Sequence, residues 1–584
     1  MSESYYKNVN PDLLGWLPLT ARRVLEIGCG EGALAAVYAE RNPNAHYTAV
    51  EVHPPSAAVA RGRVDRLIEG DIEAMSDAEA GGPFDLALMG DVLEHLAEPG
   101  RMLTRIFDLL EPGGHFVACV PNIAHWSALR ELMSGRWPAH DSGLFDRTHL
   151  RFFTRDSLQE ALTATGFRIL KMRPRRFLLD QAEAARWMPV LGAAAARMGL
   201  DRAAFEERAS AVQYVVCAEK PRPDRPRTEV LVVHQMAMAP RLLEARAAWP
   251  AKALDSEPGL SLKYDERKIE VGKLPPRQPK VAVIQRFTAS DPAQWFQAMA
   301  RFVAGGWVVA MEFDDHPELV AEVLRRDYDA GTQVSFSAAH AIQTSTPELA
   351  AYFRSLNPEV AVFPNAAFTL PPFPEARTGP PTVFFGALNR EGFSGPVARA
   401  LAPAIAQHPE TTFTVVHDRA FFDALPTERK TFHPAMGYEA YLEAMAGADI
   451  ALMPLEGRPP ERFKSDIKFV EASSRGLATI ASPTVYGQSI RDDHDGLIAA
   501  TIEDWPRHLT RLLADPGERR RLARNAWEGV RADRMFAQQA GTRRDWYRSL
   551  WDRRDALNEA LFARHPEIRL LVAAIRDAGR PPPG

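Results

Sequence analysis

Short apolar runs alternate with helical stretches along most of the chain. The first run, at 24–27, is followed after a glycine-rich turn by the helical pattern Ala33–Val37. Further apolar runs stand at 84–89 and 115–120, with helical segments between the runs. Alternation of this kind over residues 21–120 predicts a parallel, doubly wound α/β sheet, which holds its ligand at the carboxyl ends of the strands.

The same alternation resumes beyond a stiff, charged, proline-rich segment that runs from Glu219 to Arg227. Apolar runs return at 230–233, 281–284, 307–311 and 360–363, and another set begins at Thr382. These runs predict further α/β layers. The expected segments are a sheet domain at 1–218, a linker at 219–228, two lobes at 229–370 and 371–535, and a helical stretch at 536–584.

The composition is that of an ordinary globular protein. Of the 584 residues, 46% are hydrophobic and 25% are charged, and a chain of this length exceeds one hydrophobic core. The net charge of −5 gives no reason to expect a nucleic-acid partner. Cys29, Cys119 and Cys217 lie far apart, so we expect reduced thiols and neither a disulfide framework nor a metal site.

The hydropathy pattern also bears on location. No segment approaches the run of about 18 apolar residues that a membrane helix needs, and the N-terminal sequence MSESYYKNVN is polar. We therefore expect a cytoplasmic protein without a membrane span or secretion signal. Arginines at 543–554 leave open a peripheral contact with anionic lipids at the inner face of the membrane. The pattern does not predict an oligomeric state.

Three glycines, Gly28, Gly30 and Gly32, form the predicted turn between the first strand and the first helix. Glycine lets the chain bend sharply and lets a ligand approach the main chain without meeting a Cβ. The spacing Gly28-x-Gly30-x-x-Ala33, with Glu51 further on, also fits the fingerprint of dinucleotide-binding folds. The turn alone therefore leaves NAD and a nucleoside without phosphate as alternatives.

Acidic residues recur at the ends of successive predicted strands. They are Glu26, Glu51, Asp71 with its neighbour Ile72, and Asp91. Several carboxylates around one pocket would repel a pyrophosphate, whereas a cationic ligand without phosphate meets no such repulsion. Glu26 is placed to hold an amino group or its bound water, and Asp71 suits the exocyclic amine of adenine. The pattern favours S-adenosylmethionine over NAD.

Over residues 5–170 the sequence resembles the class I methyltransferases that use S-adenosylmethionine. The motifs that carry the resemblance are, in order, RVLEIGCGEG at 23–32, Glu51, GDI at 70–72, FDLALMGDVLEHL at 84–96 and LEPGGHFVACV at 110–120. The resemblance implies a Rossmann-like sheet with S-adenosylmethionine as cofactor. The residues expected to bind it are Glu26, Gly28, Gly30, Gly32, Glu51, Asp71, Ile72 and Asp91.

Two loops beyond the predicted strands, at 121–126 and 145–154, are placed to meet a methyl acceptor. We expect His149 to be the general base, because an imidazole titrates near neutrality, and His95 and His125 compete for this role. A base is needed only for a hydroxyl acceptor, since positioning and exclusion of water do most of the work of methyl transfer. A structural role for these histidines is the alternative.

In the second half, RFKSDIKFVEA at 462–472 followed by GLATIAS at 476–482 resembles the donor lobe of the two-lobed GT-B glycosyltransferases. The resemblance covers residues 280–530 and implies a nucleotide-sugar donor. Glu471 would bind its ribose, Arg462, Lys464 and Lys468 would face its diphosphate, and Gly386 belongs to the same site. Phe463 stands where the family has an acid, so no sugar contact is assigned. An exposed helix with a Lys468–Glu471 ion pair is the alternative.

Two features of the second half keep alternatives open. The acids Asp314 and Asp315 at the end of a predicted strand would suit a metal-bound diphosphate, but the rest of this half fits a metal-free design better. We therefore predict no metal. For the C-terminal stretch the resemblance implies a helix that crosses back to the first lobe, and a solvated amphipathic tail fits the sequence as well.

These observations predict a bifunctional enzyme that transfers methyl groups from S-adenosylmethionine and glycosyl groups from a nucleotide sugar. The fusion suggests a glycan or glycolipid acceptor, in glycan or surface polysaccharide biosynthesis. One alternative is a methyltransferase whose C-terminal half only binds glycan. The other is an NAD(P)-dependent sugar oxidoreductase in the N-terminal third.

Overall fold

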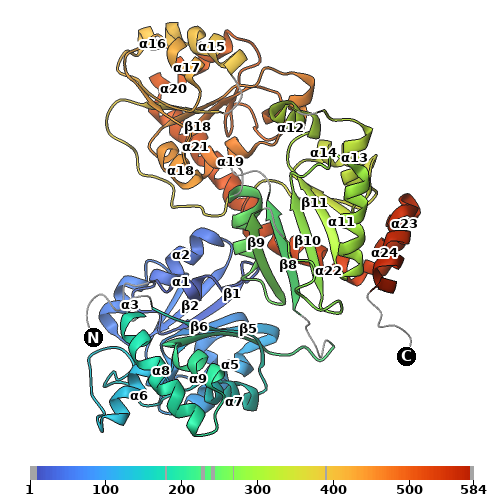
Figure 1. Ribbon diagram of the computed structural model, residues 1–584. Coiled ribbons are helices and arrows are strands. Elements are labelled where there is room, and N and C mark those ends of the chain that lie inside the picture. The colour runs from blue at the N-terminus through green and yellow to red at the C-terminus, as the bar shows by residue number, and fades with distance from the viewer. Residues whose placement is uncertain are drawn as a thin grey trace. The chain divides into compact units, whose positions relative to one another are not determined.

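The computed structural model describes residues 9–177, 181–224, 230–237, 244–266, 269–325, 327–387 and 391–578. The chain divides into two compact units (Figure 1). The first unit contains residues 1–230 together with 255–259, and the second contains 231–254 and 260–584. Residues 225–228 of the predicted linker lie outside the described residues.

A seven-stranded sheet in the order β3-β2-β1-β4-β5-β7-β6 forms the centre of the first unit. Its strands are β1 (Arg23–Ile27), β2 (His46–Glu51), β3 (Arg66–Glu69), β4 (Phe84–Gly90), β5 (Leu110–Pro121), β6 (Arg168–Arg175) and β7 (Gln213–Glu219). β1 to β5 run parallel, whereas β7 runs antiparallel to its neighbours β5 and β6. The strand order reverses between β1 and β4, and in such sheets the ligand crevice opens at that point.

Helices pack around this sheet (Figure 1). They are α1 (Pro11–Leu14), α2 (Ala33–Arg41), α3 (Pro54–Ala60), α4 (Asp77–Ala80), the 3-10 turn η2 (Leu93–His95), α5 (Pro99–Leu109), α6 (Trp126–Met133), α7 (Arg155–Thr165), α8 (Gln181–Arg197) and α9 (Arg202–Ala209). Thr154 caps the start of α7 through its hydroxyl, and Gly166 ends the helix at a φ of 104°. A left-handed residue of this kind is a common helix terminator.

The segment 255–259 belongs to the first unit, although the chain on either side of it belongs to the second. Glu257 is fully buried there. Its Oε1 accepts hydrogen bonds from the backbone amides of Leu19 and Thr20, at 2.8 and 3.1 Å, and its Oε2 accepts one from the Thr20 hydroxyl at 2.7 Å. Asp255 pairs with Lys171 of β6 at 3.5 Å. Two acids thus hold the segment in place.

The first lobe of the second unit is a six-stranded parallel sheet in the order β13-β12-β11-β10-β8-β9. Its strands are β8 (Leu231–Ala237), β9 (Leu260–Glu266), β10 (Lys280–Gln285), β11 (Val308–Phe313), β12 (Ala341–Thr344) and β13 (Val360–Val362). Its helices are the π-turn η4 (Glu244–Ala248), α10 (Trp249–Leu254), α11 (Pro292–Ala304), α12 (Pro317–Leu324), α13 (Ala330–Ser337) and α14 (Pro347–Arg354).

The second lobe is also a six-stranded parallel sheet, in the order β16-β15-β14-β17-β18-β19. Its strands are β14 (Thr382–Gly386), β15 (Thr412–Val416), β16 (Lys430–His433), β17 (Ile450–Met453), β18 (Ala478–Ala481) and β19 (Leu497–Ile498). The helical segments are α15 (Glu391–Ala400), α16 (Ala402–Gln407), α17 (Arg419–Ala424), α18 (Tyr438–Ala446), η5 (Pro459–Phe463), α19 (Ile467–Ser474), η6 (Tyr486–Gln488), α20 (Asp504–Ala514) and α21 (Pro516–Asp533).

The C-terminal helices α22 (Phe536–Asp552), α23 (Arg554–Arg564) and α24 (Pro566–Ala578) return to the first lobe. The Tyr547 hydroxyl on α22 donates a hydrogen bond of 2.8 Å to Gln343 on β12. Ile568 and Val572 on α24 are buried in the core of the first lobe, and Figure 1 shows α24 beside α11. This stretch therefore packs against the lobe and is not a solvated tail.

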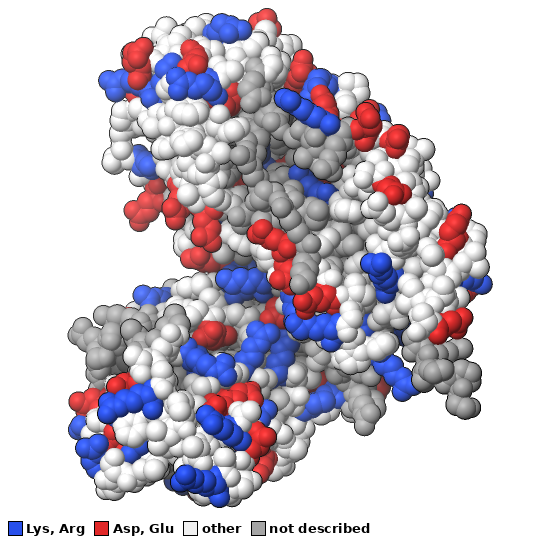
Figure 2. Space-filling view, in the orientation of Figure 1, with Lys and Arg blue, Asp and Glu red and all other residues white. Residues whose placement is uncertain are grey.

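The predicted fold is confirmed: a Rossmann-like sheet is followed by two further α/β lobes. Each sheet is mostly or wholly parallel because its strands are joined through helices that cover it. On the face shown in Figure 2, acidic and basic side chains are interspersed over both units. Among the described helices, none combines the length and the apolar character needed to cross a bilayer.

Candidate functional site

The glycine-rich turn lies at the carboxyl end of β1, where it leads into α2. Gly28, Gly30 and Gly32 have φ values of 72°, 56° and 73°. An added Cβ at Gly28 would stand 2.6 Å from Cγ2 of Val92, so no other residue fits without displacing that side chain. The turn therefore needs its glycines for backbone shape. The amides of Gly28 and Gly30 donate hydrogen bonds within the protein, to the carbonyl oxygen of Val50 and to Glu51.

Glu51, the last residue of β2, is held against this turn. Its Oε2 accepts a hydrogen bond from the backbone amide of Gly30 at 2.7 Å, and its Oε1 accepts one from the amide of His53 at 2.8 Å. The side chain is only 4% exposed. Each carboxylate oxygen has a further lone pair, so the group can still accept the two hydroxyls of a ribose.

Glu26 lies within β1, beside Glu51, and is buried. The Tyr47 hydroxyl donates a hydrogen bond of 2.9 Å to its Oε2. Burial raises the pKa of Glu26 to about 7; the Tyr47 hydrogen bond opposes this shift, and the charge of Glu51 adds to it. Because this pKa stands near neutrality, the carboxyl can respond to a nearby ammonium group.

The remaining predicted cofactor residues follow β3 and β4. Asp71 is exposed just beyond β3, and its Oδ1 accepts the amide of Glu73 at 2.9 Å. Ile72 is buried in the core. Asp91 follows β4 with a φ of 56°, accepts a hydrogen bond from Gln213, and has a pKa raised by burial to about 6. Since β3, β2, β1 and β4 are adjacent, the structure brings all four predicted acids to one edge of the sheet.

A cluster of Glu94, His95 and His149 lies beside this edge. Glu94 and His95 belong to η2, directly after β4, and His149 comes from the loop at 145–154. The two imidazole rings are 4.8 Å apart between centroids, and Nε2 of His149 is 4.0 Å from Oε1 of Glu94. Burial lowers the pKa of both histidines, which favours neutral imidazoles. The structure thus joins the two predicted catalytic histidines.

His125 and Glu94 have roles in this region that differ from those predicted from the sequence. His125, the third candidate for the base, caps α6 through Nδ1, which accepts the amide of Ser127. Glu94 was not predicted as a site residue. The signal that could have revealed it is an acid between Asp91 and His95 in a segment that directly follows a buried strand.

In the second unit, the predicted donor residues are gathered around η5 and α19. Nζ of Lys468 donates to the carbonyl oxygen of Gly386 at 2.6 Å, so these two predicted residues meet. Glu471 is buried, its Oε1 accepts a hydrogen bond of 2.7 Å from the Tyr438 hydroxyl, and burial raises its pKa. The guanidinium of Arg462 lies over the ring of Phe463 at 4.8 Å.

Lys464, the remaining predicted donor residue, pairs with an acid of the first lobe. Its Nζ is 3.4 Å from Oδ1 of Asp315. Asp315 also accepts a hydrogen bond of 3.1 Å from Arg286, and Arg286 binds Asp314 at 2.6 Å. The Arg286 charge opposes the effect of burial, and the pKa of Asp314 is lowered. The two acids considered as metal ligands are thus engaged with cationic side chains.

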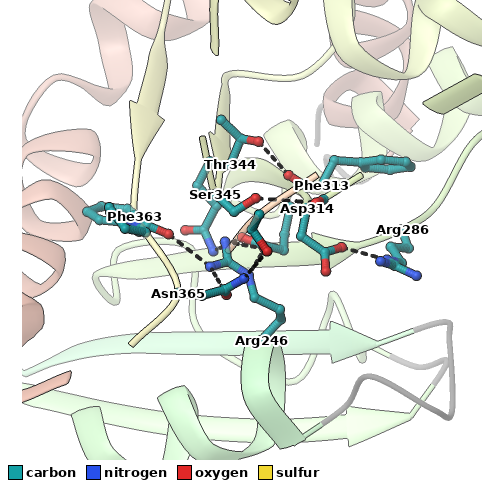
Figure 3. Close-up of polar contacts among 12 residues, drawn as sticks. Arg246, Arg286, Phe313, Asp314, Thr344, Ser345, Phe363 and Asn365 are labelled. Carbon is teal, nitrogen blue, oxygen red and sulfur yellow. Dashed lines mark hydrogen bonds and ion pairs between the residues drawn. The ribbon is translucent and has the colours of Figure 1, made fainter. Parts of the chain in front are cut away.

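Figure 3 shows the polar network around these acids, at the carboxyl ends of the first-lobe strands. Nε of Arg246 donates to Glu312 at 2.8 Å, and its Nη1 donates to the carbonyl of Phe363 and to Asn365 at 2.8 and 3.0 Å. Asn365 in turn donates to Ser465 of the second lobe at 2.6 Å. This network anchors the chain where it passes from one lobe to the other.

The comparisons with known proteins match each half separately. Residues 5–172 match the family model described as "Methyltransferase domain", and residues 390–542 match the one described as "Glycosyl transferase-like". The chain thus combines a region similar to methyltransferase domains with a region similar to glycosyl transferases. Both family models describe transferases, and neither of the two describes an oxidoreductase.

The two relatives in sequence described here are O-methyltransferases. The malonyl-[acyl-carrier protein] O-methyltransferase of Geobacter sulfurreducens is 32% identical over 154 residues, which is 26% of this chain and 57% of that protein. The ubiquinone biosynthesis O-methyltransferase of Xylella fastidiosa is 35% identical over 122 residues, which is 19% of this chain and 49% of that protein. The chain spans about half the length of these curated relatives.

Solved structures are similar to either half. An S-adenosylmethionine-dependent methyltransferase from Mesorhizobium loti is 21% identical, with a TM-score of 0.24, and the similarity covers 36% of this chain and 96% of that one. The Anabaena protein Alr3699/HepE, solved in complex with UDP and glucose, is 10% identical, with a TM-score of 0.39, and the similarity covers 55% of this chain and 99% of that one.

The matched ranges contain almost all the predicted site residues. The match at 5–172 holds all eight residues predicted to bind the cofactor and both histidines predicted to be catalytic. The glycosyl transferase-like match holds Arg462, Lys464, Lys468 and Glu471, whereas Gly386 precedes it. The roles of these residues are the subject of the proposal that follows.

Proposed function

We propose that the chain transfers a methyl group from S-adenosylmethionine in its first unit and a glycosyl group from a nucleotide sugar in its second. The acceptor is a glycan or glycolipid, so both activities serve glycan or surface polysaccharide biosynthesis. The location belongs to the same proposal: the cytoplasm, at the inner face of the membrane where the acceptor is lipid-linked. The observation that carries the methyl-transfer half is the glycine turn with Glu51 bound to it.

The residues around the turn fit S-adenosylmethionine better than a dinucleotide. The turn packs closely, since an added Cβ would meet Val92 at Gly28 and Ala60 at Gly32, and carboxylates follow at the ends of β1 to β4. Glu51 binds the ribose hydroxyls, Asp71 the adenine amine, and Glu26 and Asp91 the amino-acid part of the cofactor. A pyrophosphate would meet like charge at this edge.

When bound, the sulfonium supplies a methyl group that already has its leaving group. The protein therefore contributes position and exclusion of water. An acceptor hydroxyl must also give up its proton, and in the protein without a metal ion the Nε2 of His149 is the group placed to receive it, with His95 beside it.

In the second unit, Arg462, Lys464 and Lys468 balance the charge of the departing nucleoside diphosphate, and Glu471 binds the ribose. Each of Lys464, Lys468 and Glu471 has a partner within the protein, so donor binding exchanges these contacts for contacts with the nucleotide. The exchange favours a donor that bridges the two lobes, because Asp315 belongs to the first lobe and Lys464 to the second.

Two titrations test the proposal. The full chain should bind S-adenosylhomocysteine and not NAD in calorimetry, and tight binding of NAD alone would overturn the methyl-transfer half. A panel of UDP-, GDP- and dTDP-sugars should show release of the nucleoside diphosphate from one donor. Mass spectrometry of surface glycan from a strain that lacks the chain should then show a missing sugar and a missing methyl group.

Phe463 supports a second candidate, in which the C-terminal half binds glycan without transferring sugar. Its ring packs against His316 and lies under Arg462. Position 463 therefore carries an aromatic ring where the glycosyltransferase pattern has a carboxylate. Release of no nucleotide from any donor in the panel, together with binding of oligosaccharide, would establish this candidate.

A further inference from the structure

The cluster of Glu94, His95 and His149 contains a buried carboxyl group that accepts no hydrogen bond within the described part of the chain. Glu94 is 1% exposed, and neither of its side-chain oxygens has a hydrogen-bond partner among the residues that the structure describes. A buried polar group without a hydrogen-bond partner destabilises the folded protein, and more so when it is charged. Burial raises the pKa of Glu94 well above its ordinary value, and the charge of Asp91 adds to this shift. A group this costly calls for a partner that the protein itself does not supply.

Each of the two imidazoles is held by a contact at Nδ1, which leaves Nε2 for a ligand. Nδ1 of His95 lies 3.2 Å from the carbonyl oxygen of Thr148, and Nδ1 of His149 lies 3.3 Å from the carbonyl oxygen of Leu144. A carbonyl partner fixes the proton on Nδ1 and leaves the lone pair on Nε2. Metal-bound histidines are held in this way, since the ring nitrogen opposite the metal donates to a carbonyl or carboxylate.

The two segments that supply the cluster are tied together. The backbone amides of Leu150 and Arg151 both donate to the carbonyl oxygen of Glu94, at 2.8 and 3.0 Å. Thr148 in turn donates its hydroxyl to Asp146 at 2.6 Å. The loop that carries His149 is therefore fixed to η2, and the three side chains face one another on a rigid base.

We infer that Glu94, His95 and His149 form a binding site for a divalent transition-metal cation. One ligand atom from each residue lies within 4.8 Å of the others. Bonds of about 2.0–2.1 Å in tetrahedral geometry bring ligand atoms to roughly 3.4 Å from one another, so the longest separation shortens by up to about 1.4 Å on binding. Two imidazoles and one carboxylate favour zinc, cobalt or manganese over magnesium and calcium, which prefer oxygen ligands alone.

Three protein ligands leave coordination positions open, as in catalytic rather than structural metal sites. The cation would sit beyond the carboxyl end of β4, next to the acids proposed to bind the cofactor. An acceptor oxygen could take an open position, where a cation favours its deprotonated form. With the cation bound, His95 and His149 are ligands and not bases. The binding site itself does not rest on the proposed methyl transfer.

The test is a titration of the full chain after removal of metal with a chelator. Zinc should bind in calorimetry, and cobalt should give a visible ligand-field spectrum that zinc displaces. Magnesium or calcium at the same concentration should not compete. In Glu94→Gln and in His149→Asn the affinity for both probes should fall at least tenfold. His46→Asn, at an exposed position of β2, is the matched control and should bind like the wild type.

Folding and function are checked on the same samples. Glu94→Gln removes a buried carboxyl that has no hydrogen-bond partner, so the metal-free variant should melt no lower than the metal-free wild type, while the zinc-induced rise in melting temperature disappears. Binding of S-adenosylhomocysteine by both variants reports an intact cofactor site and separates this inference from the proposed function. The inference is wrong if the wild type takes up no more zinc than Glu94→Gln, or if all three variants match the wild type.

Discussion

The two predicted nucleotide sites differ in how their ligand-binding groups are held. In the first unit, Glu51 binds the backbone of the same turn that a cofactor would approach, so the group is already in position. In the second unit, Lys464, Lys468 and Glu471 are each engaged with another residue of the protein. One site is preorganised, and the other must give up internal contacts before a ligand can use its charges.

The difference follows from the charges that each site presents. Carboxylates can satisfy themselves with main-chain amides, which a glycine turn provides close by. Lysine side chains are long and flexible and can only donate hydrogen bonds. Without a phosphate, Lys464 and Lys468 therefore bind acceptors of the protein itself. We therefore expect binding at the first site to depend on shape and binding at the second to depend on competition between ligand and protein.

The largest effect is expected from Glu51→Ala. The change removes two charge-assisted contacts to the ribose and releases Gly30, so affinity for S-adenosylhomocysteine should fall roughly 100-fold or more. Calorimetry measures this loss, while donor hydrolysis by the second unit should be unchanged. Glu69→Ala, an exposed acid at the end of β3, is the matched control. Loss of both activities in Glu51→Ala would show that the two sites are not independent.

The next effect concerns Glu26, whose pKa rises from 4.5 to about 7 on folding. Between these values the folded chain keeps a proton that the unfolded chain releases. The free energy of unfolding is therefore highest below pH 4.5 and falls as the pH rises to about 7. Glu26→Gln removes the titration. At pH 8 the variant should be more stable than the wild type by about 3 kcal/mol, with little difference at pH 4.5. Urea unfolding at both pH values measures this, and an unchanged pH slope would contradict it.

A pair of substitutions with opposite signs tests the competition at the second site. Lys464→Ala removes a cation from the proposed diphosphate site, so affinity for UDP should fall about tenfold. Asp315→Asn releases Lys464 from its ion pair, so affinity should rise severalfold. Glu318→Gln, an exposed acid on α12 with no contact to Lys464 described, serves as the control. Equal losses in the Lys464 and Asp315 variants would mean that the pair acts as a fixed structural unit.

The smallest effect is expected from Tyr438→Phe. The Tyr438 hydroxyl lowers the pKa of Glu471 against the effect of burial, so its removal should raise that pKa further. Affinity for UDP should then be a few-fold weaker and should begin to fall at a higher pH than in the wild type as the solution is acidified. Tyr441→Phe, whose hydroxyl accepts from Lys468, should not shift the pH profile. Titrations with UDP across pH would show either outcome.

The sequence predicted most of the fold because local signals agreed with one another. The predicted glycine turn acts within a few residues, and the structure has it; the cap at Thr154 and the end of α7 at Gly166 are local signals of the same kind. The acids at the ends of β1 to β4 converge because parallel strands end at one edge. The pattern of apolar strands alone was therefore enough to predict that these acids lie at one edge of the sheet, without knowing which residues they contact.

The features that sequence could not predict all depend on contacts between distant residues. Lys464 and Asp315 are held together only by the packing of two lobes. In the sequence DVLEH nothing distinguishes Glu94 from an exposed acid. Only the fold shows that it is buried and lies beside His149, which comes from the loop at 145–154. The path of α22 to α24 was equally open, because an amphipathic helix can face either solvent or a lobe, and only the burial of Ile568 and Val572 decides between them.

The segment 255–259 has a consequence for any attempt to separate the two units. A gene cut at the proline-rich segment would produce an N-terminal fragment without Glu257, leaving the main-chain amides of Leu19 and Thr20 to find other acceptors. Fission of this protein into independent halves would therefore require the first half to replace a carboxylate that is encoded beyond the point of division. A simple division of the gene at the proline-rich segment therefore removes a carboxylate that the first unit uses.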